Sequence, residues 1–169
     1  NTIHYFYNPA VKKLGVTRFD LDKYNELSKF KRMEINVAGI VSDARILIDK
    51  AQISSQQNRV TYNSPVDPIS IIRLIADNMQ FSTQYGGMRP FGVAVMLGGV
   101  GKGKSHLYTT DVTGNFLAYR ANAIGEHDEQ IKEVLRKDFK DDMTIDDGIK
   151  FALKIFKDIL GNSQSARGE

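Results

Sequence analysis

The spacing of apolar and polar residues predicts strands and helices along the central part of the chain. Residues 34–39 alternate apolar and polar side chains, which predicts a short strand. Apolar and small residues then recur at helical spacing, which predicts a helix over about residues 43–60 with Ser42 as its N-cap. The positions expected on its buried face are Ala44, Leu47, Ile48, Ala51 and Ser55.

A second helix is predicted after the break at residues 63–65, which read Asn-Ser-Pro. Asp67 suits its N-cap, and Pro68 suits its first position because a first-turn N–H has no partner in the helix. Gly86 and Gly87 are expected to end it. The expected buried face consists of Ile72, Ile75, Ala76 and Met79.

Three strands and two further helices follow in the predicted order. The apolar run at residues 91–97 predicts a buried strand, and a hairpin leads into a second strand after Ser105. A third strand is expected over residues 115–124. Helices are expected over residues 128–139 and from Thr144. In the second of these, Thr144 and Asp147 resemble a capping box, and Gly161 is the expected stop. This order of elements indicates an α+β layered domain.

Composition excludes several classes of protein. The net charge is +3, with basic and acidic residues interspersed, so nucleic acid is not an expected partner. The chain has no cysteine, which rules out disulfides and thiolate metal sites. No apolar run reaches the length that spans a membrane, so a membrane is not an expected partner either.

Residues 98–105 match the phosphate-binding pattern G-x-x-x-x-G-K-[ST], ending in Lys104 and Ser105. A phosphate-binding loop requires a helix directly after the lysine, whose N-terminus holds the anion. Strand-forming residues such as Tyr108 and Thr109 follow instead. The favoured interpretation is therefore a basic hairpin tip with Lys102 and Lys104 in solvent. A nucleotide-binding loop that uses residues 98–105 is the alternative.

Catalytic and metal-binding arrangements are not expected. An N-terminal nucleophile needs its own free amino group as base, whereas Asn1 precedes Thr2. The three histidines, His4, His106 and His127, lie in unrelated segments without ligand spacing. The acidic pairs at residues 141–142 and 146–147 suit a helix start better than a calcium loop. We therefore expect no catalytic, cofactor or metal site.

Several sequence blocks, taken in order, resemble an α-type subunit of the proteasome core particle. The blocks are residues 39–49 (GIVSDARILID), Gln57 with Thr61 and Tyr62, residues 83–92 (TQYGGMRPFG), residues 108–114 (YTTDVTG), residues 121–125 (ANAIG) and residues 140–147 (KDDMTIDD). The likeness extends over about residues 34–159. In the turn at residues 108–114, Val112 and Thr113 stand where the family has Pro-Ser or Pro-Ala.

The resemblance implies a fold and a function. The fold would be the α/β/β/α sandwich of N-terminal-nucleophile hydrolases, with one sheet depleted. The function would be that of a non-catalytic subunit of the outer ring, which gates substrate access and docks activators. Other α and β subunits would be partners, and the location would be cytoplasmic, and also nuclear in a eukaryote. Activator C-termini would dock near Gly39, although the lysine that the family uses there falls in a region absent from this sequence.

The resemblance also implies structural or interface roles for specific residues. Gly87 and Gly86 would allow positive φ values, and Pro90 would hold Arg89 extended, facing a carboxylate that one sequence cannot name. The full set is Gly39, Asp43, Arg45, Tyr85, Gly86, Gly87, Arg89, Pro90, Phe91, Gly92, Asp111 and Gly114.

The ends of the chain depart from the family pattern. The expected organisation is a divergent segment at residues 1–33, a proteasome α-type core at residues 34–161 and a flexible tail at residues 162–169. The family's early Ser-Pro-(Asp/Glu)-Gly-Arg turn and its last strands and helix have no counterpart in this sequence. A truncated or divergent form, or a fragment of a longer product, is therefore the hypothesis, and an assembly or regulatory relic is a further alternative.

Overall fold

The computed structural model describes residues 5–8, 13–16 and 33–165. The chain divides into two compact units, one made of Asp20–Arg120 and the other of Asn1–Phe19 together with Ala121–Glu169. The described part of the first unit holds one sheet and two helices, and that of the second holds a strand pair and two helices. The helices and antiparallel sheets confirm the α+β class.

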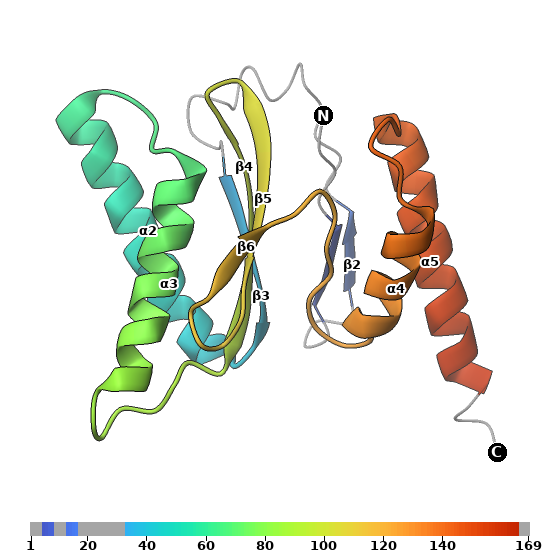
Figure 1. The fold of residues 1–169 in the computed structure, drawn as a ribbon, viewed down its shortest axis with the longest axis horizontal. Helices are drawn as coiled ribbons and strands as arrows, with labels where there is room; N and C mark the ends of the chain where they lie inside the picture. The colour runs from blue at the N-terminus through green and yellow to red at the C-terminus, as the bar shows by residue number, and fades with distance from the viewer. Residues whose placement is uncertain (1–4, 9–12, 17–32, 166–169) are drawn as a thin grey trace. The chain divides into compact units, whose positions relative to one another are not determined.

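The sheet of the first unit has four antiparallel strands in the order β3-β4-β5-β6. The strands are β3 (Met33–Gly39), β4 (Val93–Gly101), β5 (Lys104–Thr110) and β6 (Phe116–Ala118). Between β3 and β4 the chain forms a pair of helices, α2 (Val41–Tyr62) and α3 (Pro68–Gln84). Both helices lie on the same face of the sheet (Figure 1).

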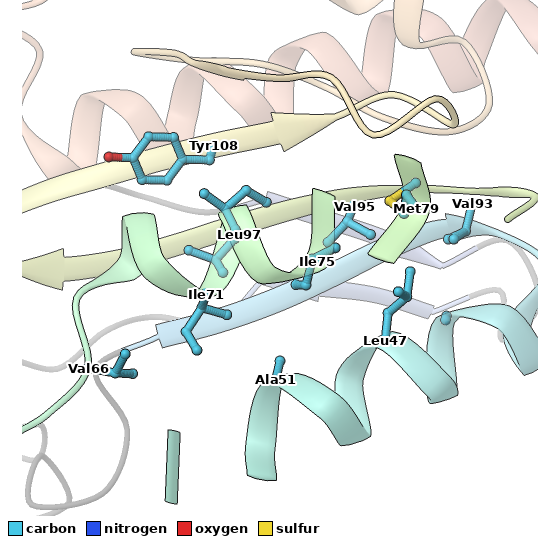
Figure 2. Close-up of a cluster of buried hydrophobic side chains, with 12 residues drawn as sticks. Leu47, Ala51, Val66, Ile71, Ile75, Met79, Val93, Val95, Leu97 and Tyr108 are labelled. Carbon is cyan, nitrogen blue, oxygen red and sulfur yellow. The ribbon is translucent and has the colours of Figure 1, made fainter. Parts of the chain in front are cut away.

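The core of this unit lies between the two helices and the sheet. Because side chains alternate along a strand, Val93, Val95 and Leu97 of β4 all point at the helices, and each is at most 1% exposed (Figure 2). Leu47 of α2 and Ile75 of α3 meet them and are also 1% exposed. This burial of aliphatic surface is the main force that holds the helix pair on the sheet.

The predicted buried faces of α2 and α3 are confirmed in most positions. Ala44, Leu47 and Ala51 of α2 are buried, as are Ile72, Ile75, Ala76 and Met79 of α3. The pattern did not predict that the carboxylate residue Asp43 also lies on the buried face of α2.

The second unit contains β1 (Tyr5–Asn8) and β2 (Lys13–Val16), which pair antiparallel, and the helices α4 (Asp128–Asp138) and α5 (Ile145–Ser165). The β1–β2 pair was not predicted from the sequence. Thr144 caps α5 as predicted, because the Asp147 N–H donates to Thr144 Oγ1 at 3.2 Å. The hydroxyl in turn donates to the Asp147 carboxylate at 2.6 Å, so the arrangement is a variant of the capping box.

Several predicted boundaries are wrong. Ser42 is not an N-cap, since α2 begins at Val41 and Ile40 is the capping residue. The third strand of the predicted set is only Phe116–Ala118 rather than residues 115–124. Gly161 does not end helix α5, which continues to Ser165. A glycine inside a helix costs only about 1 kcal/mol relative to alanine, and favourable neighbouring residues can offset that cost.

Candidate functional site

The end of β3 turns directly into α2 at Gly39, Ile40 and Val41, which we call the β3–α2 corner. Ile40 is extended, with φ −75° and ψ 113°, and its carbonyl accepts the Ala44 N–H at 3.1 Å, which starts the helix. The Ile40 N–H donates to the Gly92 carbonyl at 2.9 Å. The corner is therefore joined to the segment that leads into β4.

Asp43 is the centre of the contacts between these two segments. Arg89 Nη1 lies 2.6 Å from Asp43 Oδ2, and Arg89 Nη2 lies 2.6 Å from Asp43 Oδ1, so the pair is bidentate. The Gly92 N–H donates to Asp43 Oδ2 at 2.9 Å. The carboxylate partner of Arg89, which the sequence could not identify, is thus Asp43.

The electrostatics of Asp43 follow from these donors. The hydrogen bond from Arg89 and then that from the Gly92 N–H stabilise the ionised carboxylate, which lowers the pKa of Asp43 from 3.8 to about 2. The same hydrogen bond raises the pKa of Arg89. The Asp43 side chain is 7% exposed and that of Arg89 is 63% exposed. The ion pair therefore joins a buried anion to a cation at the surface.

Two glycines make the close approach of the segments possible. Gly39 has φ +132°, and a Cβ there would lie 2.2 Å from the Gly92 carbonyl oxygen. A Cβ on Gly92 would lie 2.6 Å from Ile40 Cδ1. At Gly39 the obstacle is backbone, so a side chain there would push the corner away from β4; at Gly92 it is the end of the Ile40 side chain, which would have to change its conformation.

Apolar side chains are exposed at the corner and on the segment before Arg89. Ile40 is 47% exposed and Val41 is 60% exposed. Tyr85, the C-cap of α3, is also exposed, and its ring lies 4.4 Å from that of Phe81 between centroids. Met88 is exposed as well, and its N–H donates to the Tyr85 carbonyl. Such side chains offer apolar contact, and apolar side chains that form a contiguous patch mark surfaces that meet a partner.

The remaining predicted site residues have local roles in the structure. Gly87 has φ +86° as expected, whereas Gly86 does not adopt a positive φ. Arg45 is exposed on α2. Pro90 and Phe91 connect Arg89 to Gly92, and the Pro90 carbonyl accepts from Arg89 at 3.1 Å. Interface roles for these residues stay a prediction.

The turn between β5 and β6 is built around Asp111. Its Oδ1 accepts the N–H groups of Thr113 at 2.9 Å and Asn115 at 3.0 Å, and the Thr113 hydroxyl donates to it at 2.6 Å. Gly114 has φ +87°, and a Cβ there would lie 2.5 Å from the Ala76 carbonyl oxygen. Asp111 and Gly114 therefore hold this turn against α3.

The segment that matches the phosphate-binding pattern lies in a β-hairpin. Lys104 begins strand β5, so no helix N-terminus follows the lysine. Lys102 and Gly103 form the tip with φ values of +50° and +74°. Lys102 is 88% exposed and lies 3.6 Å from the Asp67 carboxylate, which would repel a phosphate. The hairpin interpretation is confirmed, and the structural context that a nucleotide-binding loop requires is not present there.

The structure describes only some of the residues considered for catalysis or metal binding. Thr2 and His4 lie outside the described residues. Within the described ranges, no group of three or more His, Asp or Glu side chains is placed to hold a metal ion. Among the helices of those ranges, none is long and apolar enough to cross a bilayer.

Comparison with known proteins matches residues 25–169 to the proteasome subunit family. Over 120 residues the chain is 42% identical to a protein of Metallosphaera sedula named proteasome subunit alpha, covering 71% of this chain and 50% of that protein. Proteins with the same name from Methanocaldococcus jannaschii and Archaeoglobus fulgidus are 36% and 37% identical, covering 79% and 85% of this chain and 52% and 58% of theirs. The chain thus spans about half the length of these relatives.

Proposed function

The chain belongs to the proteasome subunit family, and we propose that it serves as a non-catalytic α-type subunit in the outer ring of a proteasome core particle. The observation that carries this proposal is the family match over residues 25–169, together with relatives that are all named proteasome subunit alpha. The motif block at residues 83–92 adds support, because its arginine and last glycine form the bonds that join the segment before β4 to α2.

We further propose that the chain contributes no nucleophile to the complex. This proposal rests on the relatives, which are named proteasome subunit alpha. Proteolytic activity would then come from partner subunits. The partners of this proposal are other α and β subunits of the particle.

Activator docking is the finer part of the proposal, and the β3–α2 corner is the surface that suits it. The exposed side chains of Ile40 and Val41 offer apolar contact. The first N–H groups of α2 have no partner within the helix, and the positive end of the helix dipole favours an anion. Because Arg89 neutralises Asp43, a carboxylate can approach this end of α2. An apolar segment ending in a free carboxylate fits these features.

The test is to co-express the chain with a β-type subunit from an archaeal core particle and to measure hydrolysis of a fluorogenic peptide. The proposal predicts that the co-purified complex hydrolyses the peptide and that the isolated chain does not. Thr2→Ala should leave the activity of the complex unchanged, whereas replacing the N-terminal threonine of the β-type subunit should abolish it. Loss of activity with Thr2→Ala would show that this chain is catalytic. Failure to co-purify would contradict the role as a ring subunit.

A further inference from the structure

We propose that Asp43 and Arg89 are positioning residues for the β3–α2 corner, and that binding of a partner at the corner is coupled to this ion pair. The inference rests on the proposed docking function of the corner. The new element is that two residues beside the docking surface, Asp43 and Arg89, determine the conformation of that surface.

The segment that contains Arg89 and Gly92 lies against the corner and is hydrogen-bonded to it. Ile40 N–H donates to the Gly92 carbonyl, and the Gly92 N–H in turn donates to Asp43. Asp43 therefore fixes Gly92, and Gly92 fixes Ile40. Loss of the bond to the Asp43 carboxylate therefore loosens the segment whose carbonyl accepts the Ile40 N–H.

Arg89 sets the position of the Asp43 carboxylate. The bidentate pair holds both carboxylate oxygens, whereas the Gly92 N–H alone holds only Oδ2. Lysine cannot reproduce this geometry because its ammonium is a point charge rather than a planar fork. Arg89→Lys thus removes the two-point contact while it keeps the charge and the bond from the Gly92 N–H.

The uneven exposure of the pair makes coupling to a partner possible. Asp43 is buried beneath the corner, whereas most of the Arg89 side chain is in solvent. A partner that covers Arg89 excludes water from the pair and strengthens it, because charges attract more strongly at lower dielectric. By reciprocity, a corner in which the pair is already formed binds that partner more tightly.

The first arm of the test measures hydrogen exchange at single amides of the full chain by NMR. The proposal predicts that Arg89→Lys and Asp43→Asn each speed exchange at the Ile40 and Gly92 amides by about tenfold or more, with little change at amides in the middle of α3. Arg73→Lys is the matched control, since Arg73 is an exposed arginine on α3, and it should change neither set. Equal exchange rates at Ile40 and Gly92 in wild type and both variants would overturn the positioning role.

The second arm measures binding of the synthetic peptide Gly-Ser-Gly-Ser-Gly-Leu-Phe-Leu with a free carboxylate to the chain in its co-purified complex. Arg89→Lys should weaken this binding by about tenfold, in line with ordinary coupling between sites, whereas Arg73→Lys should not. If wild type binds and Arg89→Lys binds equally well, the coupling is wrong while the docking function stands. If wild type does not bind the peptide, the docking function is wrong, and the exchange arm alone decides the positioning role.

Discussion

Both terminal nitrogens of Arg89 lie 2.6 Å from the carboxylate oxygens of Asp43, although the two residues are 46 positions apart in the sequence. This pair links the first turn of α2 to the segment that leads into β4. The chain runs from β3 through α2 and α3 to β4, and the Asp43–Arg89 pair joins the beginning of this connection to its end.

The Asp43–Arg89 pair predicts a pH-dependent stability at acid pH. The folded pKa of Asp43, about 2, is lower than its usual value of 3.8, so the unfolded chain takes up a proton first as the pH falls. The contribution of the pair is complete above the usual pKa and is lost as the pH falls from 3.8 towards 2. Urea unfolding should show that Asp43→Asn lowers the free energy of unfolding at pH 6, and that the difference from wild type shrinks below pH 4.

Asp77→Asn serves as the control for that measurement, since Asp77 is an exposed carboxylate on α3. Its difference from wild type should be small at pH 6. A difference for Asp43→Asn that is equally large at pH 2.5 and pH 6 would show that the carboxylate charge is not the source of the stability.

Three glycine-to-alanine variants should differ in stability in a fixed order. Gly39→Ala combines a positive φ with a Cβ 2.2 Å from a carbonyl oxygen, so it should lower the free energy of unfolding by about 2–4 kcal/mol. Gly87→Ala has only the positive φ of +86° and should cost about 1 kcal/mol. Gly86→Ala has neither problem and should stay within about 0.5 kcal/mol of wild type. Chemical denaturation of the three variants checks the order, and a Gly39→Ala variant as stable as Gly86→Ala would contradict the packing of the corner.

Leu47→Ala should test the helix-to-sheet core. Leu47 is 1% exposed and belongs to the cluster with Val93 and Val95, so removing its side chain should leave a cavity and cost about 2–5 kcal/mol. Val60→Ala on the same helix is the control, because Val60 is 87% exposed, and its effect should be below about 0.5 kcal/mol. The midpoint of urea unfolding reports the stability of both variants. Similar midpoints for Leu47→Ala and Val60→Ala would contradict the burial of the Leu47 face of α2.

Nucleotide binding should be absent at the hairpin tip. Isothermal titration of wild type with ATP and magnesium should show no heat of binding at millimolar nucleotide, because strand β5 rather than a helix follows Lys104. ATP binding that is lost in Lys104→Ala and kept in Lys140→Ala would restore the alternative interpretation of residues 98–105.

Local features of the fold could be predicted from the sequence, and long-range ones could not. The buried faces of α2 and α3 follow from helical spacing, and Pro68 marks the start of α3 because its missing N–H costs nothing there. The N-cap of α2 was misplaced because Ser42 has a suitable side chain, whereas the backbone conformation at Ile40 is set by its bond to Gly92.

The central contact of the candidate site was the least predictable part. In the sequence, a buried aspartate in the first turn of a helix looks the same as a solvent-exposed one that interacts favourably with the helix dipole. The partner of Asp43 depends on how the α2–α3 pair brings Arg89 back to the end of β3, which is a property of the tertiary fold. The motif at residues 83–92 did mark the arginine, but not what it contacts.

The central claim is that this chain is a structural subunit of a proteasome ring, and native mass spectrometry of the chain co-expressed with an archaeal proteasome α subunit tests it most directly. A ring subunit should appear in high-mass closed assemblies that contain this chain, and intact copies of the chain should dissociate from them in the gas phase. A chain that stays monomeric while the companion subunit assembles without it would contradict the account.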